Sequence, residues 1–120
     1  MKEVNIIVDN INLLFSIGNN AIENSNLIGD SEDNCLWFHS DGSPSCHVVL
    51  SMDTDINEYK NKTKQKIYRQ GCLLCKQNTN SLKSSKNEKF VFTKIGNLIS
   101  TNKPGQVYFK ENEKLKYITI

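Results

Sequence analysis

Two histidines and a carboxylate lie within nine residues of the sequence. His39, Asp41 and His47 fall on a predicted strand, turn and strand, where they could transfer protons or bind a metal ion. The patterns that usually accompany such chemistry are absent: the chain has no His-Glu-x-x-His, no Gly-x-Ser-x-Gly and no glycine-rich phosphate loop. A small metal- or thiol-dependent enzyme is therefore the weakest of the functional hypotheses.

Four cysteines offer a second potential site. Cys72 and Cys75 form a Cys-x-x-Cys pair, but a structural zinc site normally needs a second compact pair, which this sequence lacks. Because the two residues lie three positions apart in a predicted helix, they share its inner face, and buried reduced thiols explain them better. We expect no bound metal and no cofactor.

Charge is distributed unevenly along the chain. Residues 1–55 carry a net charge of −8, residues 56–94 carry +8 and the remainder carries +2, which gives the formal total of +2. Such asymmetry indicates a basic surface for a polyanion or an acidic partner, although a solvated helix followed by a lysine-rich loop gives the same pattern. Two pairs of basic residues have the i,i+4 spacing that places side chains on one side of a helix. These pairs are Lys60 with Lys64 and Lys62 with Lys66.

Two large rings are adjacent in the sequence, and they bear on nucleic-acid binding. Trp37 and Phe38 lie in a predicted strand, so they must point to opposite faces of a sheet. If one face is open to solvent, one of the two rings is a platform on which a nucleobase can stack. If both faces are covered, both rings belong to the core.

Apolar periodicity and turn-forming residues predict the elements that position these side chains. Alternating or continuous apolar runs indicate strands, and a period of three to four residues indicates helices. Strands are predicted at 3–8, 11–17, 35–39, 46–52, 90–92, 106–109 and 115–120, and helices at 21–27 and from Ile56 to about Asn78.

Four local features refine this prediction. The Asp9-Asn10 dipeptide suits the turn of an N-terminal hairpin. In the short helix, Ile22 and Leu27 are expected on the inner side, with Gly29 ending it. Gly71 is expected to mark a close packing point of the long helix. The whole is predicted to be an α+β single domain, residues 1–120, with a largely antiparallel sheet, one short helix and one long helix.

Length and hydropathy exclude several classes of protein. A chain of 120 residues supports one modest core and no second domain. No apolar run approaches the roughly 18 residues that a membrane span requires, and the N-terminal layout differs from that of a signal peptide. We therefore expect a soluble cytoplasmic protein that does not act at a membrane.

Several segments together resemble a known family. Ile17-Gly18-Asn19-Asn20 through Asn24 to Leu27, Leu36-Trp37-Phe38-His39, Ser45-Cys46-His47-Val48-Val49-Leu50, Phe90 to Lys94 and Lys103-Pro104-Gly105-Gln106-Val107 occur in that order. They resemble the NFACT-R domain, the RNA-binding module of ribosome quality control factors, over about residues 15–120. Two positions depart from the family pattern: Cys35 stands where an aspartate is usual, and Asn19 where a basic residue is common.

The resemblance implies a non-catalytic module that binds RNA, such as tRNA or ribosomal RNA, in translation or ribosome quality control. The alternative is a protein-interaction module that uses the basic segment 60–94 to meet an acidic protein partner or the ribosome. The sequence leaves the oligomeric state open. The candidate RNA-binding residues are Asn19, Asn20, Asn24, Trp37, His39, His47, Lys60, Lys62, Lys64, Lys66, Arg69 and Lys103.

Overall fold

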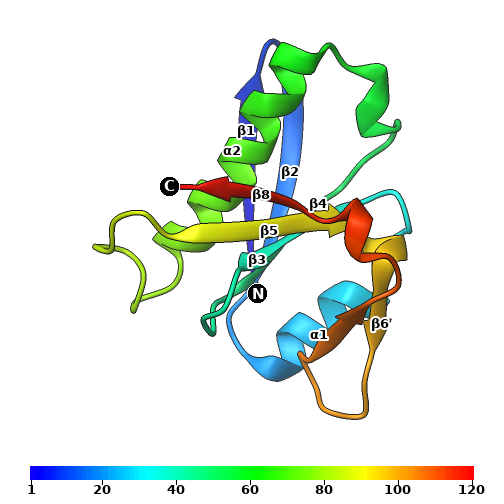
Figure 1. The fold of residues 1–120 in the computed structure, drawn as a ribbon. Coiled ribbons are helices and arrows are strands. Elements are labelled where there is room, and N and C mark those ends of the chain that lie inside the picture. The colour runs from blue at the N-terminus through cyan, green and yellow to red at the C-terminus, as the bar shows by residue number, and fades with distance from the viewer.

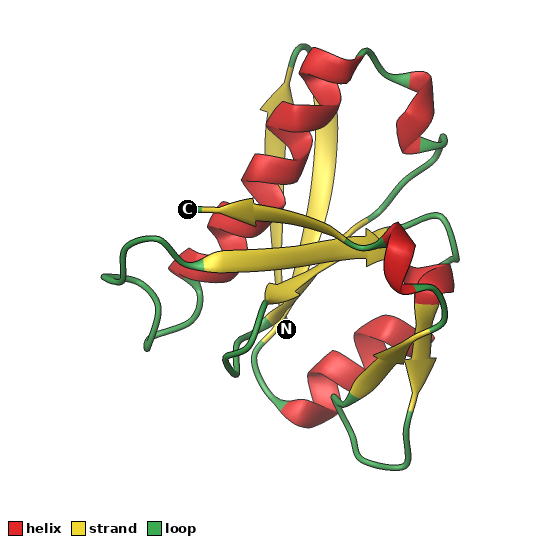
Figure 2. Ribbon diagram, in the orientation of Figure 1, coloured by secondary structure: helices red, strands yellow, loops and turns green.

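A six-stranded antiparallel sheet forms the centre of the computed structural model, which describes residues 1–120. Its strand order is β1-β2-β4-β3-β5-β8, and a separate two-stranded sheet pairs β6 with β7 (Figures 1 and 2). Two α-helices complete the predicted α+β domain, and this fold class is confirmed. The strands are β1 (Lys2–Val8), β2 (Ile11–Gly18), β3 (Leu36–Ser40), β4 (His47–Leu50), β5 (Lys89–Lys94), β6 (Leu98–Ser100), β7 (Val107–Phe109) and β8 (Lys116–Thr119). The helices are α1 (Ala21–Gly29) and α2 (Asn61–Gln77), with short 3₁₀ turns η1 (Ile56–Glu58), η2 (Ile95–Asn97) and η3 (Asn112–Lys114).

The N-terminal hairpin turns at Asp9 and Asn10, as predicted. Both residues have positive φ angles, 49° and 67°, which a two-residue type I′ turn requires. The turn sets the register of β1 against β2, with Val8 opposite Ile11. Because the register is fixed, alternate β2 residues such as Phe15 and Ile17 enter the core.

β3 divides the core into two layers. Phe38 packs on the α2 side of the sheet, and Trp37 packs on the other side with Leu27, Val49 and Leu98. Both rings are buried, Trp37 with 2% and Phe38 with 0% of its surface exposed. The alternative of a sheet covered on both faces is therefore confirmed, and neither ring is an exposed platform for base stacking.

The long helix begins later than the sequence predicted. The start near Ile56 is wrong, because Ile56–Glu58 forms a separate 3₁₀ turn whose N-terminus is capped by the Asp55 side chain. Tyr59 and Lys60 are then extended, with ψ angles of 155° and 149°, so Lys60 is the N-cap of α2. The apolar period continues across this break because η1 also directs Ile56 into the core.

The short helix and the second sheet hold two further differences. Ile22 is 67% exposed, so its predicted inward position is wrong, whereas Leu27 is buried and α1 ends at Gly29 as predicted. The buried side of α1 is formed by Asn24, Leu27 and Ile28, and Ile22 lies on the opposite side of the helix at 100° per residue. The second difference is β6, a strand that the sequence did not predict because three residues are too few to produce an apolar period.

All four cysteines are free and buried, which confirms the buried-thiol prediction. Burial raises the pKa of Cys72 to about 12, so this thiol stays protonated near neutral pH. The hydrogen bond with Cys46 and burial raise the pKa of Cys75. Cys72 and Cys75 therefore pack as small apolar side chains in the layer between the sheet and α2, whereas Cys35 lies in the layer on the other face.

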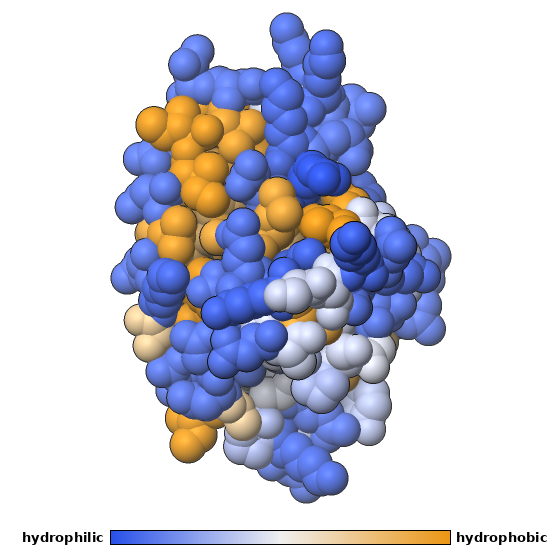
Figure 3. All heavy atoms as spheres, turned by 90° about the vertical axis from the view of Figure 1, so that its left-hand side faces the viewer, coloured by the Kyte–Doolittle hydropathy of each residue, from blue (hydrophilic) through white to orange (hydrophobic).

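β1 lies at one edge of the sheet and leaves apolar side chains at the surface. Ile7 is 72% exposed, and Val4 and Ile6 are half-buried against the core. Viewed from the left-hand side of Figure 1, hydrophobic side chains gather on the side where β1 and β2 lie (Figure 3). No helix in the structure has the length and apolar character needed to cross a membrane.

Gly71 is the close packing point that the sequence predicted, and its replacement by alanine should lower the free energy of unfolding by about 1–3 kcal/mol. A methyl group there would lie 2.4 Å from ring atoms of Phe38, which is held in the core. Gly29→Ala is the matched control, because nothing lies within 4 Å of its added methyl group. The control should be neutral or stabilising by up to about 1 kcal/mol. Equal urea-unfolding midpoints for the two variants would contradict this packing.

Candidate functional site

A surface groove of about 390 Å³ lies beside the outer end of β3. Its walls are His39, the turn between β3 and β4, and Gly105 to Val107, while Trp37 and Phe109 contribute its apolar side. The tertiary fold thus brings together three segments that the sequence analysis singled out separately. They are the Trp-Phe-His strand, the start of the His-Val strand and the Pro-Gly-Gln loop.

His47 is fixed by a hydrogen bond inside this site. The indole Nε1–H of Trp37 donates to His47 Nδ1 at 3.1 Å, so this nitrogen must be unprotonated and the neutral ring carries its proton on Nε2. Burial, followed by repulsion from His39, lowers the pKa of His47 to about 3. His47 is therefore a neutral imidazole with an N–H on Nε2.

His39 has the opposite tautomer. Its Nδ1 lies 2.7 Å from the carbonyl oxygen of Ser40, and because a carbonyl only accepts, Nδ1 carries the proton. The ring lies parallel to the Trp37 indole with centroids 5.4 Å apart, and it meets the His47 ring edge-on at 4.8 Å. Burial lowers the pKa of His39, so the neutral ring presents an acceptor at Nε2.

The asparagines near the start of α1 have structural roles. Asn20 is the N-cap, and its side chain accepts a hydrogen bond from the Glu23 backbone N–H at 2.9 Å. Glu23 in turn accepts from the Asn19 backbone N–H at 3.0 Å and pairs with the N-terminal ammonium of Met1 at 2.9 Å. Sequence reasoning missed Glu23, although the Asn-x-x-Glu spacing of a capping box could have identified it.

Three of the predicted RNA-binding residues are buried: Trp37, His47 and Asn24. Trp37 borders the groove but exposes only 2% of its surface, so it offers no open ring face for base stacking. His47 lines the groove although it is buried, and Asn24 places its Oδ1 over Gly18, with no hydrogen-bond partner in the protein. Of the predicted residues in this region, His39 is the half-buried side chain that borders the groove.

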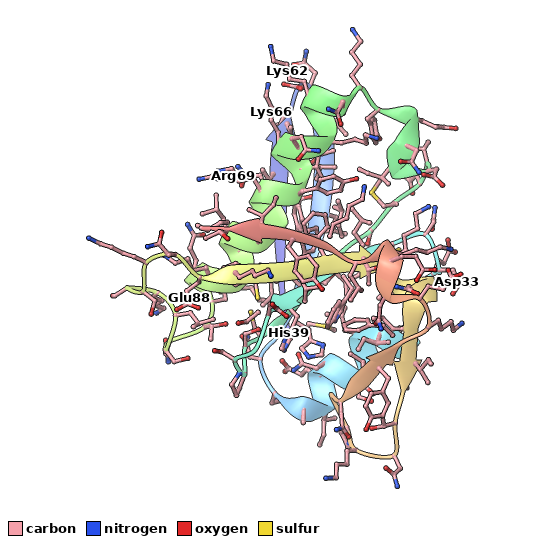
Figure 4. The ribbon with its side chains drawn as sticks, in the orientation of Figure 1. Asp33, His39, Lys62, Lys66, Arg69 and Glu88 are labelled. Carbon is pink, nitrogen blue, oxygen red and sulfur yellow. The ribbon has the colours of Figure 1, made fainter.

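The predicted basic residues lie on different sides of α2. Lys62, Lys66 and Arg69 follow one outer side of the helix (Figure 4), and the 3.6-residue period places Lys76 in line with them. We call these four residues the α2 ridge. Lys66 pairs with Asp9 at 2.8 Å.

Lys60 and Lys64 lie apart from this ridge. Because Lys60 precedes the first helical residue, the predicted i,i+4 pairing on one helix side holds for Lys62 with Lys66 and not for Lys60 with Lys64. Lys60 is the N-cap, and Lys64 donates to Asn57 of η1 at 3.5 Å. Lys103 lies in the exposed loop before Gly105, where its backbone N–H donates to Thr101 Oγ1 at 3.1 Å.

A second depression, of about 580 Å³, lies between the end of α2 and the groove. It is lined by Gln77 at the end of α2, by Asn19 and Lys83, and by Pro44, which also borders the groove. The path therefore runs from the last turn of α2, past the turn between β3 and β4, to His39.

Sequence reasoning also missed a basic cavity of about 630 Å³ on another part of the surface. Tyr68 and Phe92 contribute its aromatic lining. Two of its lysines are paired, Lys94 with Asp55 at 2.8 Å and Lys114 with Glu111. Four lysines line it, Lys94 from β5 and three from residues 110–116, and only the tertiary structure brings Lys94 beside the other three: Lys94, Lys110, Lys114 and Lys116.

The histidines and most of the cysteines lie on opposite faces of the sheet. His39 and His47 lie on the α1 side, and Cys46, Cys72 and Cys75 belong to the layer under α2. No group of three or more His, Cys, Asp or Glu side chains is placed to hold a metal ion. Cys46, Cys72 and Cys75 therefore do not share a site with the two histidines.

Comparison with known proteins identifies the fold. No family model and no curated protein matches the chain. Among solved structures, the C-terminal part of the fibronectin/fibrinogen-binding protein from Streptococcus suis is similar, with a TM-score of 0.77 and 18% sequence identity. The match covers 100% of this chain and 45% of that chain, so the present chain spans less than half the length of its structural neighbour. At this identity, the similarity shows a shared fold.

The buried state of His47 predicts a pH-dependent stability. The imidazole titrates near pH 6.5 in the unfolded chain and near pH 3 in the folded protein, so the unfolded state binds the extra proton as the pH falls between these values. Stability should therefore be complete above about pH 6.5 and decrease by about 1.4 kcal/mol per pH unit below it.

Urea unfolding of the native protein and His47→Gln between pH 6.5 and 5 isolates this effect, because most carboxylates titrate below that range. The glutamine side chain can still accept from Trp37 but does not titrate, and His39 is present in both proteins. The variant should show a slope smaller by about one proton. Identical slopes would mean that His47 is protonated in the folded state.

Proposed function

We propose that this domain is a non-catalytic RNA-binding module that acts on structured RNA of the translation machinery, such as tRNA or ribosomal RNA. The observation that carries the proposal is the α2 ridge, where four cations follow one outer side of a single helix. The ridge spans about 21 Å from Lys62 to Lys76, long enough to follow several phosphates of a nucleic-acid backbone. The NFACT-R resemblance supports the same function independently of charge.

The positions of the acidic residues favour RNA binding at the α2 ridge. Only Asp9 is paired with the ridge, through Lys66. Asp30, Glu32 and Asp33 lie in the segment between α1 and β3, and Figure 4 shows Asp33 on the opposite side of the molecule from Lys62, Lys66 and Arg69. These carboxylates therefore lie away from the ridge, which favours the approach of a polyanion to the ridge.

Lysines without a rigid partner act on phosphates as point charges, so the module should bind with little sequence preference through the ridge. A protein partner is the second candidate function, because the structural neighbour comes from a fibronectin/fibrinogen-binding protein. The basic segment 60–94 would then meet an acidic protein surface. Measurements of RNA binding distinguish the RNA-binding function from the protein-interaction function.

Lys62→Gln/Arg69→Gln should weaken tRNA binding by about tenfold at low salt and reduce the slope of log affinity against log salt by about 1.5, because two phosphate contacts are lost. Filter binding at several salt concentrations measures both quantities. Lys110→Gln/Lys114→Gln removes the same charge outside the ridge, so it is the matched control and should change the slope much less.

Equal effects of the two double variants would mean that net charge, and not the ridge, controls binding. If the folded native protein binds no RNA at about 50 mM salt, where phosphate contacts are strong, the RNA proposal fails and the protein-partner proposal takes its place.

A further inference from the structure

The groove beside β3 has two hydrogen-bonding nitrogens without a partner in the protein. Nδ1 of His47 accepts a hydrogen bond from the Trp37 indole N–H, and Nδ1 of His39 donates one to the Ser40 carbonyl. The remaining nitrogens therefore differ: Nε2 of His47 is a donor, and Nε2 of His39 is an acceptor. Both rings border the groove, and their centroids are 4.8 Å apart.

The two rings are held rigidly, so the donor and the acceptor are fixed in advance. The indole of Trp37 stacks on His39 and contacts His47 edge-on, and Phe109 contacts the indole at 5.8 Å. Trp37 is itself in the core. A ligand that uses both nitrogens therefore does not have to order flexible side chains, which lowers the entropic cost of binding.

A third polar atom without a partner lies on the same face of the sheet. Asn24 is buried, and its Oδ1 acceptor lies against Gly18, the residue that pairs with His47 across β2 and β4. Buried polar groups are nearly always hydrogen-bonded, so the unpartnered Asn24 Oδ1, together with the unpartnered Oγ of Ser40 in the groove wall, indicates that a polar molecule belongs in this region.

The charge around the groove selects a neutral ligand group. No lysine or arginine lines it, and its single carboxylate, Asp41, lies 3.7 Å from the Lys89 ammonium. A phosphate would find no cation on these walls. A planar heterocycle with a donor and an acceptor on one edge fits the two nitrogens, and about 390 Å³ is enough for one base with part of its sugar.

We infer that this groove binds a single unpaired nucleobase, whose hydrogen-bonding edge meets Nε2 of His39 and Nε2 of His47. This inference rests on the proposed RNA-binding function and assigns a base-binding site to it. The depression bordered by Pro44 lies between the end of α2 and the groove, so an RNA whose phosphates follow the ridge can continue past the end of α2 and place a loop nucleotide at His39. Unpaired bases in loops and bulges are the usual targets of protein recognition in RNA.

Uncharged nucleosides test the groove separately from the ridge. Adenosine, cytidine, guanosine and uridine are titrated into the native protein while the imidazole ¹⁵N signals of both histidines are followed by NMR. We expect at least one nucleoside to shift the Nε2 signals of His39 and His47, and ribose, which lacks a base, to leave them unchanged. Shifts confined to other residues, or no shift at about 20 mM nucleoside, would overturn the inference, since even weak sites bind in the millimolar range.

Two variants complete the test. His39→Phe keeps an aromatic ring against Trp37 but removes the acceptor, so nucleoside affinity should fall at least fivefold in a protein whose circular dichroism is unchanged. Lys62→Gln/Arg69→Gln should keep the nucleoside shifts of the native protein. If tRNA binds through the ridge but no nucleoside shifts the histidines, the groove inference fails and the proposed function stands. If nucleosides bind but tRNA does not, the proposed function fails and the base site stands.

Discussion

The structure depends on two large rings that are neighbours in one strand. Adjacent strand residues point to opposite faces, so Trp37 and Phe38 can both be buried only if the sheet is covered on both sides. α2 covers Phe38, whereas α1 and the β6–β7 sheet cover Trp37. Burial of two such side chains stabilises the fold by several kcal/mol, and an open face would forfeit one of these contributions. The three-layer arrangement follows from this single dipeptide.

The two covering layers have different surfaces. α2 has a strongly buried inner side, with Gly71 allowing the helix backbone to approach the Phe38 ring, and its outer side carries the cations of the ridge. The opposite layer is formed by short elements and loops, and it leaves a groove where the β3–β4 turn meets Gly105. A regular helix therefore provides an extended charged surface, and an irregular layer provides a concave one.

Trp37 links the core to the groove. Its indole ring is buried among Leu27, Val49 and Leu98, while its one polar atom donates to His47. Trp is suited to this position because a buried indole N–H needs an acceptor, and a neutral imidazole supplies one. The bond excludes a proton from His47 Nδ1 and so determines which nitrogen faces the groove. Core packing thereby sets the hydrogen-bonding character of a surface site.

The sequence alone determined those features that depend on neighbours within a few residues. Asp9 and Asn10 specify the first turn through their tolerance of positive φ, the apolar period identifies α2, and Gly71 marks its close contact. The fold class follows from the same local patterns. The break before Asn61 was not predicted, because a three- to four-residue period does not distinguish a continuous helix from a 3₁₀ turn followed by a helix. The exposure of Ile22 was not predicted either, because in a short helix this period does not distinguish the inner from the outer side.

Only the tertiary structure decided which residues meet. His39, Pro44 and Gly105 form one groove although up to 66 positions separate them, and η1 places Asn57 within 3.5 Å of Lys64. The same long-range packing turned Trp37 from a candidate surface residue into a core residue and gave the two histidines opposite tautomers. The physical reason is that burial and hydrogen bonding between distant segments depend on how the layers pack, whereas turns and helix periods depend on the local backbone.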